Sequence, residues 1–119
     1  MKDSGQRDTF ASGAVRDTAD DKPRPDLISP FAAERLGAWL ADGAKKYAER
    51  NWEKGIPMTR VLASLERHLI AWKQGMHDED HLAAIMCNAM FLLDYDERIQ
   101  RCLLDDSIND MPKYWEAMG

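Results

Sequence analysis

The sequence predicts an all-α fold, a compact bundle of three or four helices behind an extended N-terminal arm. Apolar residues recur at spacings of three and four through residues 30–98, as they do on one face of a helix. No segment shows the alternation of period two that marks a strand. The 119 residues allow one hydrophobic core but not two. We therefore expect one domain, with an arm or loop at 1–29, a helical core at 30–98 and a helical tail at 99–119.

Composition narrows the class of protein. The net charge of −5 argues against a nucleic acid polymer as partner, because affinity for a phosphate backbone depends on a basic surface. No apolar run approaches the ~18 residues that a membrane helix needs, and the N-terminus lacks the apolar stretch of a secretory leader. We therefore expect a soluble cytoplasmic protein that has no membrane partner.

The N-terminal segment, residues 1–29, is polar, contains glycines and prolines, and shows almost no apolar periodicity. Such a segment buries too little apolar surface to offset the entropy that is lost on ordering. A disordered tail is therefore one interpretation. The alternative is an arm that Phe10, Ala14 and Val15 anchor to the core.

Two helices are expected next. The first should cover residues 30–50, because Ser29 offers an N-cap and Pro30 suits the first helical position. The second should cover residues 58–74, with Gly75 as its stop. Its apolar stripe has His68 at the edge and comprises Met58, Val61, Leu65, Leu69 and Trp72.

A third helix should begin at the acidic run 78–80, which supplies an N-cap and suits the positive end of the helix dipole, and should continue past Arg98. Its predicted apolar stripe comprises Leu82, Ile85, Met86, Ala89, Leu92 and Leu93. Cys87 and Cys102 each lie in an apolar helical pattern, which favours buried free thiols over a disulfide.

Histidines and carboxylates gather around the turn between the second and third helices. They are His68, His81, Asn88, Glu66, Asp78, Glu79 and Asp80. If these helices are antiparallel, the carboxylates could hold a hard divalent cation while a histidine positions or deprotonates a water. The alternative is structural, because such residues often serve as hydrogen-bonding groups and caps. Zinc is disfavoured, since no HExxH or CxxC spacing is present.

A second group combines cations with an aromatic ring and an amide. It comprises Lys45, Lys46, Arg50, Asn51 and Trp52, with Arg60 and Arg67 further along. These residues could hold a polyphosphate and stack a base. The alternative is again structural, because lysines at the end of a helix complement its dipole. No Walker A or GxSxG sequence is present, which argues against a P-loop fold and against a serine hydrolase.

Five blocks of the sequence resemble one known family. They are DSGQRDTFASGAVRD at 3–17, KPRPDL at 22–27, GAKKYAERNWEKGIP at 43–57, the pair Arg67 and His68, and DEDHLAAIMCN at 78–88. In this order they resemble the phage and prophage proteins of the dATP/dGTP diphosphohydrolase domain family, which is related to the MazG-type all-α nucleoside triphosphate pyrophosphohydrolases.

The resemblance implies Mg²⁺-dependent hydrolysis of a purine deoxynucleoside triphosphate to the monophosphate and pyrophosphate, in the cytoplasm of a bacterial host. Mn²⁺ is the alternative ion. The resemblance also implies an ordered arm whose glycines, Gly5 and Gly13, let the backbone approach the triphosphate. Donors to the triphosphate would come from Ser4, Arg7, Ser12 and Arg16.

On this interpretation the catalytic residues are His68 and His81. The metal ligands are Glu66, Asp78, Glu79 and Asp80. The nucleotide contacts are Arg7, Arg16, Lys45, Lys46, Arg50, Asn51, Trp52, Arg67 and Asn88. The chain lacks the paired ExxE and ExxD carboxylates of MazG-type enzymes, so the metal site is either rebuilt from these four carboxylates or missing.

A non-catalytic nucleotide-binding or protein-interaction module is the alternative function. In such a module His68, His81 and Asn88 would form a buried hydrogen-bond network. Four tryptophans and seven methionines in so small a chain would leave apolar surface uncovered, which favours a homo-oligomer.

Overall fold

The computed structural model describes residues 3 and 5–118 of the chain. Ser4, one of the expected triphosphate donors, lies outside the described residues. The main elements are the helices α1 (Pro30–Tyr47), α2 (Met58–Lys73) and α3 (His81–Gln100). The short elements are the 3-10 turns η1 (Pro25–Leu27), η2 (Asn51–Lys54) and η3 (Asp106–Ile108), and the helix α4 (Tyr114–Met118). The predicted fold class is confirmed, because the chain is mostly helical.

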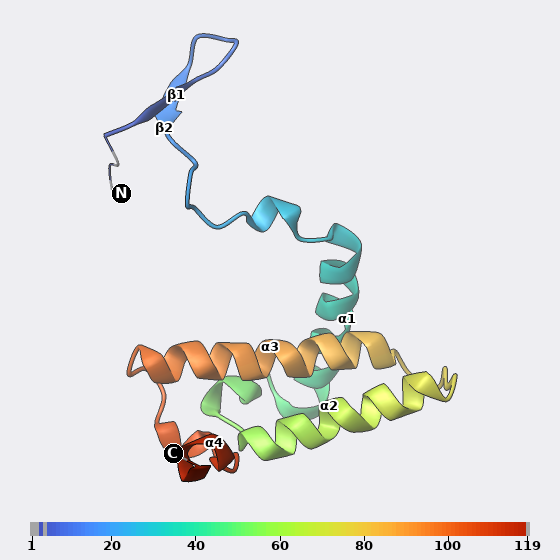
Figure 1. Ribbon diagram of the computed structural model, residues 1–119. Coiled ribbons are helices and arrows are strands. Elements are labelled where there is room, and N and C mark those ends of the chain that lie inside the picture. The colour runs from blue at the N-terminus through green and yellow to red at the C-terminus, as the bar shows by residue number, and fades with distance from the viewer. Residues whose placement is uncertain (1–2, 4, 119) are drawn as a thin grey trace.

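Helix α3 is the centre of the fold. It packs against both α1 and α2, and α2 runs antiparallel beside it (Figure 1). The buried apolar side chains are Val61 on α2 and Ala83, Ala84, Cys87 and Tyr95 on α3. Because alanine side chains are small, the helix backbones can approach closely along this face.

The arm forms a β-hairpin that the sequence analysis did not predict. Strands β1 (Arg7–Thr9) and β2 (Val15–Asp17) are antiparallel, with Arg7 opposite Asp17. Strands of three residues are too short to show a period of two, which explains the missed prediction. Phe10 and Val15 are exposed, so they do not anchor the arm to the core. The hairpin stands away from the helices (Figure 1), and the radius of gyration of 19.2 Å exceeds the roughly 14 Å of a compact chain of this length.

The first two helices follow the sequence closely. The side chain of Ser29 caps α1 by accepting from the N–H of Ala32 at 3.1 Å, as predicted. Helix α1 ends at Tyr47, earlier than expected, because Ala48 and Arg50 both have positive φ, 100° and 58°. Gly75, with φ 78°, stops α2 as predicted.

Two predictions for the third helix and its tail are wrong. Leu82 and Leu93, in the predicted core stripe of α3, are 44% and 72% exposed. Apolar residues lie on several sides of α3, so periodicity alone could not select the buried face. Cys102 is exposed, because the helix ends at Gln100 and Cys102 turns away with φ 58°. The prediction of free thiols is confirmed for both cysteines, and Cys87 is buried.

One end of the α2–α3 pair is built from aromatic rings, and we call Trp52, Phe91 and Tyr95 the aromatic end. The rings of Trp52 and Phe91 stack with centroids 4.7 Å apart. Tyr95 is fully buried, and its hydroxyl donates to the backbone oxygen of Trp52 and accepts from the N–H of Ile56. These bonds fix the connector between α1 and α2 onto α3.

The C-terminal tail closes the same end of the helix pair. The N-terminus of α2 has no side-chain cap of its own, since Pro57 precedes it, and Asp110 supplies one by accepting from the N–H of Thr59 at 2.9 Å. A Cβ on Gly55, which has φ 100°, would lie 2.8 Å from Ile108, so this close approach requires glycine. Within the described residues, no helix has the length and apolar character needed to cross a membrane.

Candidate functional site

The other end of the α2–α3 pair gathers titratable side chains. His68 lies in the last turns of α2, and His81 is the first residue of α3. Gly75 ends α2 and the side chain of Asp80 caps α3 by accepting from the N–H of Ala83 at 3.1 Å, so the turn between them is short. We call His68, Asp78, Glu79 and His81 the histidine end.

The two histidines contact each other directly. Their Nδ1 atoms are 2.9 Å apart, which places one proton between them. The Nε2 atom of His81 lies 2.8 Å from an oxygen of Asp78, so its N–H donates to that carboxylate. His81 is only 5% exposed, and these two contacts satisfy both of its ring nitrogens.

Glu79 completes a group that could hold a metal ion. One donor atom from each of His68, Glu79 and His81 lies within 4.8 Å of the others. Within the part of the chain that the structure describes, this is the one group of three or more such side chains. The arrangement thus offers two imidazole nitrogens and one carboxylate oxygen.

Burial and charge tune the protonation of this group. Burial lowers the pKa of His68 below its ordinary value, an effect that the nearby Glu79 charge opposes. The rings of Trp39 and His68 are perpendicular, with their centroids 5.6 Å apart. The hydrogen bond from His81 lowers the pKa of Asp78. At neutral pH His68 is therefore uncharged and Asp78 is ionised.

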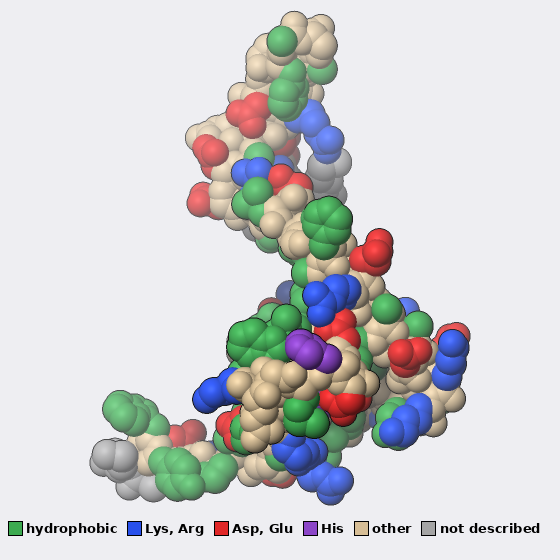
Figure 2. All heavy atoms as spheres, turned by 90° about the vertical axis from the view of Figure 1, so that its right-hand side faces the viewer, with side chains coloured by type: hydrophobic (Ala, Val, Ile, Leu, Met, Phe, Trp, Pro, Cys, Tyr) green, Lys and Arg blue, Asp and Glu red, His purple; other side chains and the backbone are tan. Residues whose placement is uncertain are grey.

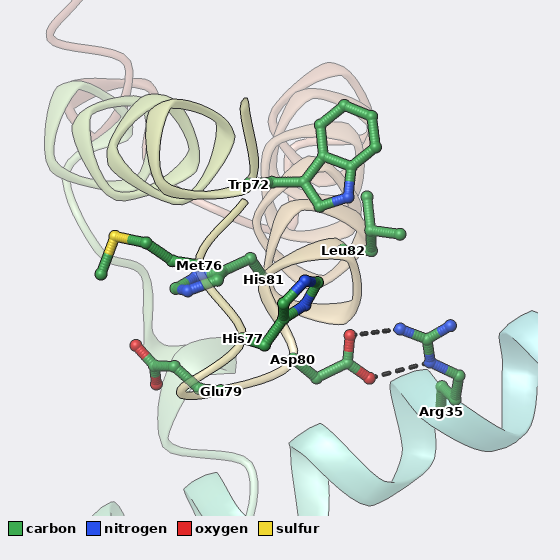
Figure 3. Close-up of a pocket in the computed structure, with 8 residues that line it drawn as sticks. All are labelled: Arg35, Trp72, Met76, His77, Glu79, Asp80, His81 and Leu82. Carbon is green, nitrogen blue, oxygen red and sulfur yellow. Dashed lines mark hydrogen bonds and ion pairs between the residues drawn. The ribbon is translucent and has the colours of Figure 1, made fainter. Parts of the chain in front are cut away.

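A hollow adjoins this group. It is lined by Arg35, Trp72, Met76, His77, Glu79, Asp80, His81 and Leu82 (Figure 3). Figure 3 shows Glu79 on the side of His81 and Met76, whereas Asp80 turns toward Arg35 of α1. At this end of the molecule, histidine, acidic and basic side chains lie beside hydrophobic surface (Figure 2). The hollow therefore combines apolar walls with charged groups.

The four carboxylates that the sequence analysis assigned to a metal have separate positions. Glu79 belongs to the His68–Glu79–His81 group. Asp78 is outside this group, and its carboxylate bonds to Nε2 of His81. Asp80 pairs with Arg35, whose Nε donates at 2.9 Å, and this pair lowers the pKa of Asp80. Glu66 is exposed on α2, outside the group.

Most of the expected nucleotide contacts lie elsewhere. Lys45 and Lys46 are exposed in the last turn of α1. Arg50 pairs with Glu53, and Asn51 is half-buried in η2. Trp52 stacks on Phe91 at the aromatic end.

The remaining expected contacts are divided between the arm and the helix pair. In the hairpin, Arg7 pairs with Asp3 and Asp17, and Arg16 is exposed opposite Asp8. Asn88 is buried in α3, where its amide donates to Ser64 and to the backbone oxygen of Ala84. Arg67 is exposed beside His68.

Sequence reasoning missed Arg35, Trp72 and His77 as lining residues of the hollow. Arg35 reaches Asp80 across 45 positions of sequence, and no local pattern encodes that contact. Trp72 was assigned to the core stripe of α2, but it is 47% exposed. The available signal was its position one turn beyond His68 on the same helix.

Comparison with known proteins agrees with the resemblance. Residues 12–106 match the family described as dATP/dGTP diphosphohydrolase, N-terminal. Searches of the curated proteins and of the solved structures found no match. The matched segment contains all three main helices and the whole histidine end. Since the match covers well over half of the sequence, the chain belongs to the dATP/dGTP diphosphohydrolase N-terminal domain family.

Proposed function

We propose that this chain is a nucleotide pyrophosphohydrolase, which converts dATP or dGTP to the monophosphate and pyrophosphate. The observation that carries the proposal is the His68–Glu79–His81 group beside a hollow with apolar and charged walls, in a domain of a diphosphohydrolase family. A purine needs an apolar wall to stack on, and its triphosphate needs charged groups at one end of that wall.

In this proposal the histidines handle the proton of the attacking water. His68 accepts that proton, because burial lowers its pKa and keeps it uncharged at neutral pH. Asp78 holds the Nε2 side of His81, and His81 in turn holds the Nδ1 side of His68. The water oxygen bonds to the α-phosphorus, and pyrophosphate leaves.

The hollow would hold the base. Trp72 offers an exposed ring, and Leu82 lies on the same side of the hollow (Figure 3). Stacking of a base on an aromatic ring is worth about 1–3 kcal/mol. Trp72 therefore takes the stacking role that the sequence analysis gave to Trp52, whose ring is stacked on Phe91.

In this proposal Mg²⁺ is bound to the triphosphate of the nucleotide and arrives with it. When bound, such an ion neutralises phosphate charge. The expected ligands do not fit a resident, all-oxygen Mg²⁺ site in the described residues, because Asp80 is paired with Arg35 and Asp78 with His81. We therefore assign no step to a resident Mg²⁺.

The test is a nucleotide panel. The purified chain is incubated with each common dNTP and NTP, with Mg²⁺, with Mn²⁺ and with EDTA, while pyrophosphate and orthophosphate are followed separately. We expect pyrophosphate without orthophosphate from dATP or dGTP, and a loss of about 100-fold or more for His68→Gln. No pyrophosphate from any nucleotide, with circular dichroism showing a folded chain, would overturn the proposal.

The second candidate is a nucleotide-binding module without catalysis. Two of the expected site residues favour it, because their side chains form structural hydrogen bonds. Asp80 caps α3, and Asn88 bonds within the helix pair. The two candidates separate if dGTP quenches tryptophan fluorescence while the panel yields no pyrophosphate. In that outcome His68 and His81 serve only to join α2 to α3.

We also propose that the chain forms a homo-oligomer, in which the exposed face of α3 is the interface. Met86 and Leu93 lie on one side of that helix, and both are exposed. An apolar stripe of this kind is typical of a surface that another chain covers. Leu93→Lys should lower the mass measured by light scattering, and an unchanged mass would contradict this interface.

A further inference from the structure

The donor atoms at the histidine end disagree with the Mg²⁺ site that the resemblance implies. We infer that His68, Glu79 and His81 bind a borderline first-row divalent ion, of the class of Co²⁺ and Zn²⁺, in preference to Mg²⁺. The inference deepens the proposed function and rests on it for what the ion does there: an ion on Nδ1 would leave the proton of His68 on Nε2, so the ion would activate the water in place of His68. Binding itself is measured without nucleotide.

Donor chemistry gives the first argument. Mg²⁺ prefers oxygen ligands and gives up its water reluctantly, whereas imidazole nitrogen suits Zn²⁺, Co²⁺ and similar ions. The group offers two imidazoles and one carboxylate. The other carboxylates of the turn are engaged, because Asp78 bonds to His81 and Asp80 to Arg35. Glu79 is thus the one oxygen donor in the group.

Geometry gives the second argument. Two nitrogens that bind one ion at about 2.1 Å lie roughly 3.0–3.4 Å apart, and the Nδ1 atoms of His68 and His81 are 2.9 Å apart. The ion would replace the proton that these atoms share. Glu79 is exposed, and a carboxylate oxygen of Glu79 lies within 4.8 Å of a ring nitrogen of each histidine, so its side chain can move to reach the same ion.

The hydrogen bond behind His81 gives the third argument. A histidine that binds a metal usually donates its other ring N–H to a carboxylate, which fixes the tautomer and raises the basicity of the ligand. Asp78 occupies this position, 2.8 Å from Nε2 of His81. The Nδ1 side of His81 is thus oriented toward His68, and Asp78 is a positioning residue.

The site has no local sequence motif, because its ligands come from both sides of a turn. His68 and His81 are 13 positions apart on two different helices, so a search for HExxH or CxxC spacing does not find them. The ion would therefore join α2 to α3, and binding should raise the thermal unfolding temperature of the chain.

The test uses Co²⁺ alone, because its bound form absorbs visible light. The full chain is treated with EDTA, dialysed and titrated with Co²⁺ in the absence of nucleotide. We expect one Co²⁺ per chain, displaced by Zn²⁺, and unaffected by a roughly 100-fold excess of Mg²⁺. The unfolding temperature should rise with Co²⁺ and remain unchanged with Mg²⁺.

Matched variants assign the ligands. Glu79→Gln and His68→Gln should abolish the absorption, and Asp78→Asn should weaken Co²⁺ binding about 10- to 100-fold. His77→Gln, in the same turn but outside the group, should bind as the unaltered chain does. Glu79 is exposed, so its variant keeps the test interpretable even if a histidine variant unfolds.

Three outcomes would overturn the inference: no Co²⁺ absorption by the unaltered chain, Co²⁺ binding by Glu79→Gln and His68→Gln that equals the binding by the unaltered chain, or displacement of Co²⁺ by an equal concentration of Mg²⁺. Stoichiometric Co²⁺ binding without pyrophosphate release from any nucleotide would support the metal site and reject the proposed hydrolase. Pyrophosphate release from a chain that binds no Co²⁺ would support the proposed hydrolase and reject the metal site.

Discussion

The two ends of the α2–α3 pair use similar residue types in opposite ways. At the aromatic end, the hydroxyl of Tyr95 bonds to backbone groups of the connector, and the ring of Trp52 is stacked on Phe91. At the histidine end, His68, Asp78 and His81 bond to one another, and the ring of Trp72 is left 47% exposed. Polar groups that bond to the backbone hold a fold together. Polar groups that bond to one another beside an exposed ring can instead exchange a proton or a ligand.

The largest expected effect is the difference in stability between variants of Trp52 and of Trp72. Trp52→Ala should lower the free energy of unfolding by about 3 kcal/mol, because it removes a stacked ring and leaves a cavity. Trp72→Ala should lower it by less, about 1 kcal/mol, since nearly half of the side chain is exposed. Urea unfolding followed by circular dichroism measures both values. Equal losses of stability would remove the distinction between the two ends.

Tyr95→Phe tests the polar part of the aromatic end. The substitution leaves the ring in place but removes the partner of the Trp52 oxygen and of the Ile56 N–H. We expect a loss of about 2 kcal/mol, because these two part-buried backbone groups lose their partner. Pyrophosphate release by the folded fraction should be unchanged. A selective loss of activity without a loss of stability would place the active site at this end instead.

Local chemistry explains which parts of the fold could be predicted. Ser29, Gly75 and Asp80 each act on backbone groups within three residues, so their caps and stops could be recognised from sequence. The buried face of α3 could not, because the choice depends on which side α2 and α1 cover. Ala83 and Ala84 are buried there because they allow close approach, although Leu82 and Leu93 are more apolar.

The candidate site was predictable to a similar degree. His68, Glu79 and His81 were expected to converge, because a short turn between antiparallel helices brings their ends together. The hydrogen bonds that distinguish Asp78 from Asp80 were not predictable. One carboxylate bonds to a neighbouring histidine, and the other to Arg35 on a helix far away in sequence.

Asp80 offers a smaller test at the histidine end. Asp80→Ala removes the N-cap of α3 and should lower the free energy of unfolding by about 1 kcal/mol. Asp80→Asn keeps an acceptor for the Ala83 N–H and loses only the charge that pairs with Arg35, so the loss should be smaller. Thermal unfolding measures both. Asp80→Ala also loses the pair with Arg35, so if Asp80→Asn costs as much stability as Asp80→Ala, the stabilisation comes from the ion pair and not from the cap.

The smallest expected effect is the pH dependence of stability at the aromatic end. Hydrogen bonds from Thr59 lower the pKa of Asp110 in the folded chain, whereas the unfolded value is about 3.9. The unfolded chain therefore binds more protons in this range, and the stabilisation is present above about pH 4 and is lost as the pH falls through the folded pKa. Asp110→Asn should flatten this part of the curve of unfolding free energy against pH. Asp106→Asn, on η3 of the same tail, is the matched control and should leave the curve unchanged. If both variants respond alike, the acid sensitivity belongs to the net charge of the tail and not to its attachment to α2.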